Sequence, residues 1–153
     1  MTTAEIIEYV SGLGGVLKVS PAEGSEWPAI SWGDTFFYYA PDGVVPTTGQ
    51  PFATLVTKDY PDDRTSRLDR PDTFRVNIAV GKEAFTEWTG HAPGHGPADT
   101  DASVTDTVIA HPVYGTAGWL AVLNPGPRTA APVRDLLRIA HDRARTRFER
   151  RPR

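Results

Sequence analysis

Hydrophobic and polar positions along this 153-residue chain follow two periods, one typical of helices and one typical of strands. Near the start, Thr2 and Glu5 have the spacing of a capping box. The apolar residues that follow recur every three or four positions until Gly14-Gly15. This pattern predicts a first helix that ends at the glycine pair, where a left-handed backbone is easily adopted.

A long helix is predicted near the other end of the chain. Thr129 is the expected N-cap, and Pro132 fits the first helical turn. A shorter helix is predicted at 82–89, where Phe85 and Trp88 lie three positions apart on one side. The apolar residues that would form the buried face of the long helix are Val133, Leu136, Leu137, Ala140, Ala144 and Phe148.

Alternation of apolar and polar residues predicts strands between these helices. The pair Gly33-Asp34, which lies between two aromatic segments, predicts a hairpin turn. In the segment 73–80 the alternation puts Arg75 and Asn77 together on the face opposite the apolar residues, so this strand is expected to be half-buried. The other predicted strands are 16–19, 36–39, 52–58, 104–109 and 119–123.

The order α-β-β-β-β-α-β-β-α, in which hairpins dominate, predicts an α+β protein. The expected architecture is a two-layer sandwich, in which the N-terminal, middle and long C-terminal helices pack on one face of an antiparallel β-sheet. The chain length fits a single domain that spans 1–153. Residues 91–103, rich in Gly and Pro, are expected to form a mobile loop, and residues 150–153 a frayed tail.

The composition limits the class of protein. With 39% hydrophobic and 23% charged residues, the chain has the composition of a soluble globular protein. It has no cysteine, so a disulfide, a thiolate metal site and a Cys nucleophile are excluded. The first residues lack the pattern of a signal peptide, and no apolar run approaches the ~20 residues of a membrane span. We therefore expect a cytoplasmic protein that does not enter a membrane.

The corner at 111–115, His-Pro-Val-Tyr-Gly, carries the most suggestive chemistry. The imidazole of His111 and the phenol of Tyr114 could face one cavity and exchange protons with a ligand, which makes them the candidate catalytic residues. Trp119 and Asn124 would form walls of that cavity. In the alternative interpretation, the corner is only a turn and Tyr114 covers the core. The first interpretation predicts that His111 titrates, and that its pKa responds to Tyr114→Phe because the phenol is its hydrogen-bond partner.

Arginines upstream suggest a small anion site. Arg67, Arg70 and Arg75 could form it together with Asn77, because a guanidinium group suits a carboxylate or a phosphate. Arg75 is the better candidate, since it lies in a predicted strand. For the two loop arginines the alternative is salt bridging to acidic neighbours, which are Asp59, Asp62, Asp63, Asp69 and Asp72.

The remaining histidines do not indicate a metal site. His91 and His95 are four positions apart, but Pro93 and Gly94 interrupt the helix that would put both on one face. His141 lies beside the apolar face of the last helix, where a partly buried imidazole satisfied by a neighbour is expected and a catalytic role is the alternative. We therefore expect neither a metal nor a cofactor.

The segment from Thr129 onward contains eight Arg and three acidic residues, whereas the whole chain has a net charge of −3. A basic helix on an acidic body raises the alternative of a nucleic-acid-binding module. No aromatic residues are interleaved with these arginines and no groove-reading motif is found, so we expect nucleic-acid binding to be weak and unspecific. A third alternative is a non-catalytic interaction protein that dimerises through exposed aromatic residues, so the chain is expected to be a monomer or a homodimer.

The segments 52–60, 68–78, 111–115 and 119–126 together resemble an actinobacterial family of domains of unknown function, family 6194. More remotely, the N-terminal helix, the Arg-x-Asn strand and the final Trp strand with its Ala-rich helix are similar to YjbR/MmcQ-like proteins. The resemblance implies an antiparallel sheet with helices packed on it. It transfers no catalytic residue.

These patterns together predict a protein that binds a small organic ligand in a pocket near His111. They identify neither the ligand nor a reaction. The residues expected to contact the ligand are Arg75, Asn77, His111, Tyr114, Trp119 and Asn124.

Overall fold

Antiparallel strands form a six-stranded sheet in the part of the chain that the computed structural model describes, residues 1–97 and 100–150. Most strand positions hold aromatic or branched residues, which pack well on a pleated surface. The strands are β1 (Val16–Val19), β2 (Thr35–Tyr39), β3 (Ala53–Val56), β4 (Arg75–Ala79), β5 (Ile109–Ala110) and β6 (Trp119–Leu123). Their order across the sheet is β1-β2-β3-β4-β6-β5, and each neighbouring pair is antiparallel.

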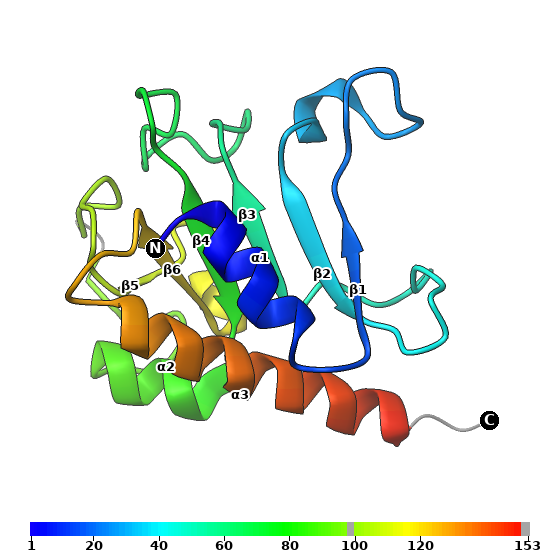
Figure 1. The fold of residues 1–153 in the computed structure, drawn as a ribbon. Coiled ribbons are helices and arrows are strands. Elements are labelled where there is room, and N and C mark those ends of the chain that lie inside the picture. The colour runs from blue at the N-terminus through cyan, green and yellow to red at the C-terminus, as the bar shows by residue number, and fades with distance from the viewer. Residues whose placement is uncertain (98–99, 151–153) are drawn as a thin grey trace.

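Helices cover one face of this sheet (Figure 1). They are α1 (Thr3–Ser11), α2 (Gly81–Thr89) and α3 (Ala130–Glu149). Apolar residues of all three pack in one core cluster with sheet residues such as Phe37 and Ile78. Leu136 and Leu137, on the predicted apolar face of α3, are fully buried there. This arrangement confirms the predicted two-layer α+β sandwich and the predicted order of its elements.

The opposite face of the sheet carries the alternate side chains of the same strands. The register pairs Thr54 with Asn77, and Arg75 lies two positions before Asn77 on the same face, as predicted. That face is buried, because Arg75 and Asn77 are only 2% and 3% exposed. The prediction of a half-buried strand is therefore wrong. The loop that carries Asp63 and Ser66 folds over this face and bonds to Arg75.

The first helix begins as predicted. The hydroxyl of Thr2 accepts a hydrogen bond from the Glu5 N–H (3.1 Å), and the Glu5 carboxylate accepts one from the Thr2 N–H (3.0 Å). The helix ends before the glycine pair, which forms the turn into β1. Gly15 has a φ of 66°, and a Cβ there would lie 2.7 Å from the Tyr39 ring, so this turn requires glycine.

The segment before β2 differs from the prediction. It is a short 3-10 helix, η1 (Ala29–Ser31), so the hairpin turn predicted at 33–34 is wrong. Asp34 is 1% exposed, and its carboxylate accepts hydrogen bonds from the Lys58 ammonium group and the Tyr60 hydroxyl. A buried carboxylate is stable only with such partners. Here the partners tie the start of β2 to the loop after β3.

Little of the strand predicted at 104–109 forms, because only Ile109 at its end belongs to β5. Asp106 has a φ of 50°, which interrupts the extended backbone. Its carboxylate accepts hydrogen bonds from the N–H groups of Gly126 and Thr129 and from the Thr129 hydroxyl. Thr129 directly precedes α3, as predicted, but its side chain makes no capping hydrogen bond to the helix.

The predicted loop 91–103 and the predicted tail 150–153 are described only in part. The described part of 91–103 contains turns without a helix or strand. Residues 98–99 of that predicted loop, and 151–153 of the predicted frayed tail, lie outside the described residues. Among the helices of residues 1–97 and 100–150, none combines the length and apolar character needed to cross a bilayer.

Candidate functional site

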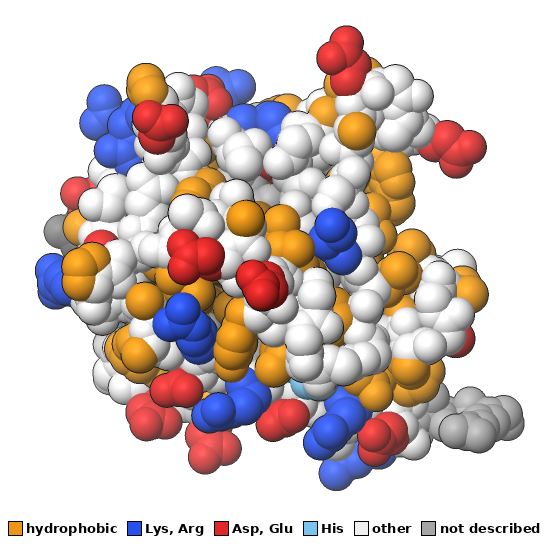
Figure 2. All heavy atoms as spheres, viewed as in Figure 1, with side chains coloured by type: hydrophobic (Ala, Val, Ile, Leu, Met, Phe, Trp, Pro, Cys, Tyr) orange, Lys and Arg blue, Asp and Glu red, His pale blue; other side chains and the backbone are white. Residues whose placement is uncertain are grey.

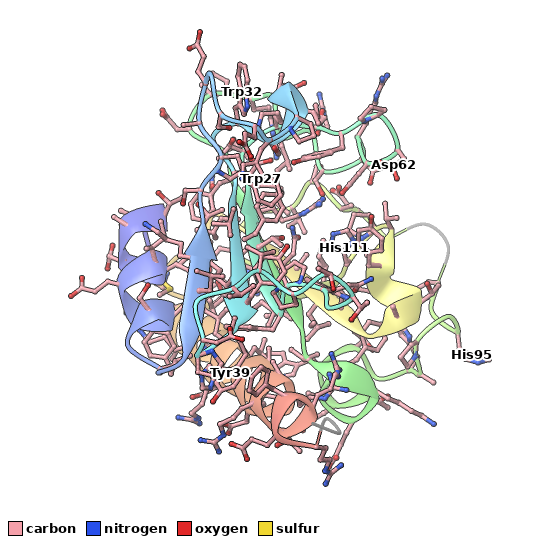
Figure 3. All side chains as sticks on the ribbon, turned by 90° about the vertical axis from the view of Figure 1, so that its right-hand side faces the viewer. Trp27, Trp32, Tyr39, Asp62, His95 and His111 are labelled. Atoms are coloured by element: carbon pink, nitrogen blue, oxygen red, sulfur yellow. The ribbon has the colours of Figure 1, made fainter. Side chains whose placement is uncertain are left out.

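A cavity of about 460 Å³ lies on the sheet face opposite the helices. Side chains of β3, β4 and β6 form its floor, and its walls come from the segment around η1, the loop after β3 and the corner that leads into a second 3-10 helix, η2 (Tyr114–Ala117). In Figure 3, Trp27 and Asp62 lie above His111. Large apolar side chains of the lining are Trp27, Ile30, Phe36, Val56, Tyr114 and Trp119.

The fold brings together nearly all the residues predicted to line a pocket. Asn124 is the exception, since it is not among the residues that line the cavity. Its amide oxygen accepts a hydrogen bond from the Phe74 N–H (3.0 Å), and its amide nitrogen donates to the Asp72 carbonyl (3.1 Å). Asn124 therefore fastens the chain before β4. The predicted residues that line the cavity are Arg75, Asn77, His111, Tyr114 and Trp119.

Arg75 is the centre of a polar network on the cavity floor. Its Nε donates to the Asn77 amide oxygen (2.7 Å), and its Nη1 donates to Asp63 (3.0 Å) and to the Ser66 hydroxyl (2.8 Å). Its Nη2 forms an ion pair with the other oxygen of Asp63. The Asn77 amide nitrogen donates to the Thr54 hydroxyl (2.9 Å). The buried positive charge of Arg75 is therefore compensated within the protein.

His111 lies beside this network and is 4% exposed. Its Nδ1 accepts hydrogen bonds from the main-chain N–H groups of Val113 (3.0 Å) and Tyr114 (2.9 Å). Burial and then the positive charge of Arg75 lower the pKa of His111 to about 3, although the Asp63 carboxylate acts in the opposite direction. The imidazole is therefore neutral at pH 7, and the prediction that it titrates near neutral pH is wrong.

The contact between His111 and Tyr114 also differs from the prediction. Their rings lie 4.9 Å apart between centroids with an interplanar angle of 42°, so they pack against each other. The hydrogen bond between the two residues comes from the Tyr114 main chain, whereas the prediction assigned it to the phenol. The pKa of His111 is therefore not expected to depend on the Tyr114 hydroxyl.

The mouth of the cavity is apolar and partly open. Trp27, Ile30 and Tyr114 line it and are 39%, 43% and 52% exposed. Tyr60 also lines the cavity, but its hydroxyl donates to Asp34. Burial and then this hydrogen bond raise the pKa of Tyr60, so its phenol stays protonated. The cavity thus has apolar walls above a polar floor.

The loop arginines do not join the site. Arg67 and Arg70 are not part of the cavity lining, so the predicted anion site that combined them with Arg75 does not form. Arg70 donates from Nη2 to the carbonyls of Ser66 (3.2 Å) and Ser103 (3.0 Å). In the described part of the chain, neither loop arginine forms an ion pair with the acidic residues around it. The alternative of salt bridging is therefore wrong as well.

The other histidines lie away from the cavity lining. His141 is 3% exposed, its Nε2 donates to the Gly14 carbonyl (2.7 Å), and its ring packs edge-on against Tyr39. This is the buried, satisfied imidazole that was expected. Figure 3 shows His95 on the outside of the molecule. Among residues 1–97 and 100–150, no group of three or more His, Asp and Glu side chains, with or without His91 and His95, is arranged to hold a metal ion.

Acidic residues accompany the arginines of α3. Arg138 pairs with Asp135 at 3.4 Å, and Arg145 lies 3.8 Å from both Asp142 and Glu149. In the lower part of Figure 2, basic and acidic side chains are interspersed around this helix. The helix therefore does not present an uninterrupted basic surface in the part of it that is described.

A family model matches the chain over residues 1–153, which is its whole length. The chain belongs to the family of unknown function DUF6194. This agrees with the nearer of the two resemblances seen in the sequence. No curated protein and no solved structure matches the chain. Membership of DUF6194 gives the cavity neither a ligand nor a reaction, so its function has to be argued from its residues.

Several residues of this DUF6194 cavity were not foreseen as site residues. The sequence indicates Asp63 only as a partner of the loop arginines, whereas in the structure it is the ion-pair partner of Arg75. Thr54 could have been predicted as a site residue. It lies in the predicted strand 52–58, and the register of β3 and β4 pairs it with Asn77. Trp27 and Ile30 lie in a segment without strand or helix periodicity, so no pattern placed them at the cavity.

Proposed function

We propose that this α+β domain binds a small organic molecule in the cavity around His111. The main support is the combination of a cavity of about 460 Å³, apolar walls and a floor of buried polar groups. Small-molecule sites typically have volumes of roughly 300–1,000 Å³, mostly apolar linings and a few convergent polar groups. The cavity has each of these properties.

The exposed aromatic residues at the mouth support the same proposal. Large apolar side chains that stay exposed in a cluster usually mark a binding surface. Trp27, Ile30 and Tyr114 come from two distant parts of the sequence, and each remains more than a third exposed while lining one cavity. A planar, mostly apolar ligand would cover them and remove their surface from water.

The proposal is one of binding and not of acid–base catalysis. A general base needs a free lone pair that faces the substrate. The Nδ1 lone pair of His111 is taken by two main-chain N–H groups, which leaves the hydrogen of this neutral imidazole on Nε2. His111 is therefore suited to donate a hydrogen bond to a ligand. Tyr114 contributes a ring face.

A screen of one- and two-ring aromatic fragments by ligand-observed NMR tests the proposal. Fragments that bind the parent protein should bind Tyr114→Ala about 3–10-fold more weakly, since an aromatic contact contributes roughly 0.5–1.5 kcal/mol beyond the buried area. Trp88→Ala is the matched control, because Trp88 is 44% exposed and is not part of the cavity lining. No bound fragment, or equal losses in the two variants, would contradict the proposal.

The remaining sequence predictions are not needed for this proposal and stay predictions. They include the remote similarity to YjbR/MmcQ-like proteins, the actinobacterial origin, the cytoplasmic location, the monomeric or homodimeric state and the weak, unspecific binding of nucleic acid. A dimer that leaves the mouth around Trp27 and Tyr114 open is compatible with ligand binding. A dimer that closes this mouth would compete with the ligand, which makes the oligomeric state in the presence of a bound fragment informative.

A further inference from the structure

We infer that the cavity selects an uncharged molecule that presents a hydrogen-bond acceptor, such as an amide or ketone oxygen, to the floor formed by Arg75, Asn77 and His111. This inference rests on the proposed ligand-binding function and adds the chemical class of the ligand. It follows from the N–H groups on the floor, some of which have no acceptor in the described part of the protein.

The first of these donors is Nε2 of His111. The N–H groups of Val113 and Tyr114 both point at Nδ1, at 3.0 Å and 2.9 Å, so Nδ1 carries no hydrogen. A neutral imidazole then has its hydrogen on Nε2. The nearest carboxylate, that of Asp63, lies 3.9 Å from Nε2, which is too far for a hydrogen bond. The Nε2–H group is therefore buried without an acceptor among the described residues.

The second donor belongs to Arg75. One hydrogen of its Nη2 is directed to Asp63, and the same nitrogen lies 3.2 Å from His111 Nε2. Because Nε2 is itself protonated, two donors face each other there. A carbonyl oxygen has two lone pairs and can accept from both nitrogens at once. Such an oxygen would relieve an arrangement that the protein alone leaves unsatisfied.

The third donor is the amide of Asn77. Its oxygen accepts from Arg75 Nε (2.7 Å), which fixes the amide nitrogen on the side of Thr54. One amide hydrogen goes to the Thr54 hydroxyl (2.9 Å), and the other has no acceptor in the described residues. Asn77 lines the cavity and is 3% exposed. The floor therefore offers N–H donors of His111, Arg75 and Asn77 to a ligand.

The charges around the floor favour an uncharged acceptor. The positive charge of Arg75 is already paired with Asp63, whose side chain is 10% exposed, and Asp62 adds a second carboxylate to the lining. A carboxylate ligand on the floor would be brought close to the largely buried Asp63 carboxylate, and the exposed Asp62 would add a weaker, more screened repulsion. An ammonium group would be attracted by Asp62, but on the floor it would face N–H donors that cannot bond to it and the positive charge of Arg75. An amide or ketone oxygen satisfies the donors without adding charge.

Isothermal titration with matched probes tests the inference. The probes are naphthalene, naphthalene-2-carboxamide, naphthalene-2-carboxylate and 2-naphthylmethylammonium, which share one apolar skeleton. The carboxamide should bind at least about tenfold more tightly than either charged probe, because each charged probe loses hydrogen bonds or gains repulsion. Equal or tighter binding of a charged probe would overturn the inference and leave the proposed function standing. If none of the four binds, it is the proposed function that fails.

The variant His111→Asn removes the Nε2–H donor while keeping an acceptor for the main chain of the corner. The Asn side-chain oxygen can replace Nδ1 as the acceptor for Val113 and Tyr114, but the Nε2–H group is lost. Affinity for the carboxamide should fall about 5–10-fold, the effect of one hydrogen bond, while affinity for naphthalene stays the same. His141→Asn is the control, since it changes an equally buried imidazole outside the cavity lining.

Asn77→Asp provides a second variant if His111→Asn does not fold. It replaces the amide donor by a carboxylate and should reverse the preference, so that 2-naphthylmethylammonium binds more tightly than the carboxamide. An unchanged order of affinities in the folded variant would contradict the assigned role of Asn77.

Discussion

The burial of His111 predicts a specific dependence of stability on pH. The pKa of the imidazole is 6.5 in a solvated chain and about 3 in the folded protein. Between these values the unfolded chain binds a proton that the folded protein does not. Unfolding is therefore favoured as the pH falls. The contribution of His111 to stability is fully present above pH 6.5 and is lost progressively as the pH falls toward 3.

The size of this effect follows from the two pKa values. For one group with pKa values of 6.5 and about 3, the loss of stability between pH 7 and pH 5 is about 2 kcal/mol. The geometry gives the physical reason, because protonation of Nδ1 would place an N–H group against the N–H groups of Val113 and Tyr114. Carboxyl groups titrate mainly below this range, so they contribute little to the change.

Urea denaturation of the parent and His111→Asn at pH 7, 6 and 5 measures the effect. The parent should lose about 2 kcal/mol more than the variant between pH 7 and pH 5, since only the parent carries the shifted imidazole. His141→Asn, assayed in parallel, controls for the loss of a different buried histidine. An equal loss in the parent and His111→Asn would refute the reasoning. So would an NMR titration in which the His111 ring protonates between pH 5 and pH 8 in the folded protein.

Two further predictions concern the framework that holds the site. Leu137→Ala should lower the free energy of unfolding in urea melts by about 2–5 kcal/mol, because Leu137 is fully buried. Arg138→Ala should lower it by under about 0.5 kcal/mol, because the Arg138 side chain is 59% exposed. Equal losses in the two variants would contradict this and place Arg138 in a packed environment. Asp106→Asn should lower Tm at pH 7 and make Tm less sensitive to acid below pH 4. The Thr129 hydroxyl holds the pKa of Asp106 below its ordinary value, so the stabilisation by this carboxylate is present at neutral pH and lost in acid. An identical acid dependence of Tm in the two proteins would contradict this role.

The sequence alone predicts that Arg75 and Asn77 share one face of a strand, because this depends only on the alternation of neighbouring residues. Alternation in 73–80 is enough to put both side chains on one face of β4, and the structure has them there. The burial of that face is a tertiary property. It depends on a loop that brings Asp63 and Ser66 over the sheet, and such a loop has no periodicity from which its path could be predicted.

In the site, too, the sequence predicts which residues come together but not which of their atoms form hydrogen bonds. The corner at 111–115 could be recognised as a place where His111 and Tyr114 come together. Which atom of Tyr114 bonds to the imidazole depends on the backbone of the corner, where the N–H groups of Val113 and Tyr114 turn toward Nδ1. That turn fixes the tautomer, and the tautomer decides whether His111 donates or accepts in the cavity.

Fluorine NMR of the protein labelled with 5-fluorotryptophan tests the central claim, ligand binding in the cavity, most directly. The chain has 4 Trp residues. Trp27 and Trp119 line the cavity, whereas Trp88 on α2 does not. Titration with naphthalene-2-carboxamide should shift the resonances of Trp27 and Trp119 with a common saturation curve and leave Trp88 unchanged. Saturating probe that shifts no resonance, or that shifts Trp88 without Trp27 and Trp119, would contradict the claim that this cavity binds the ligand.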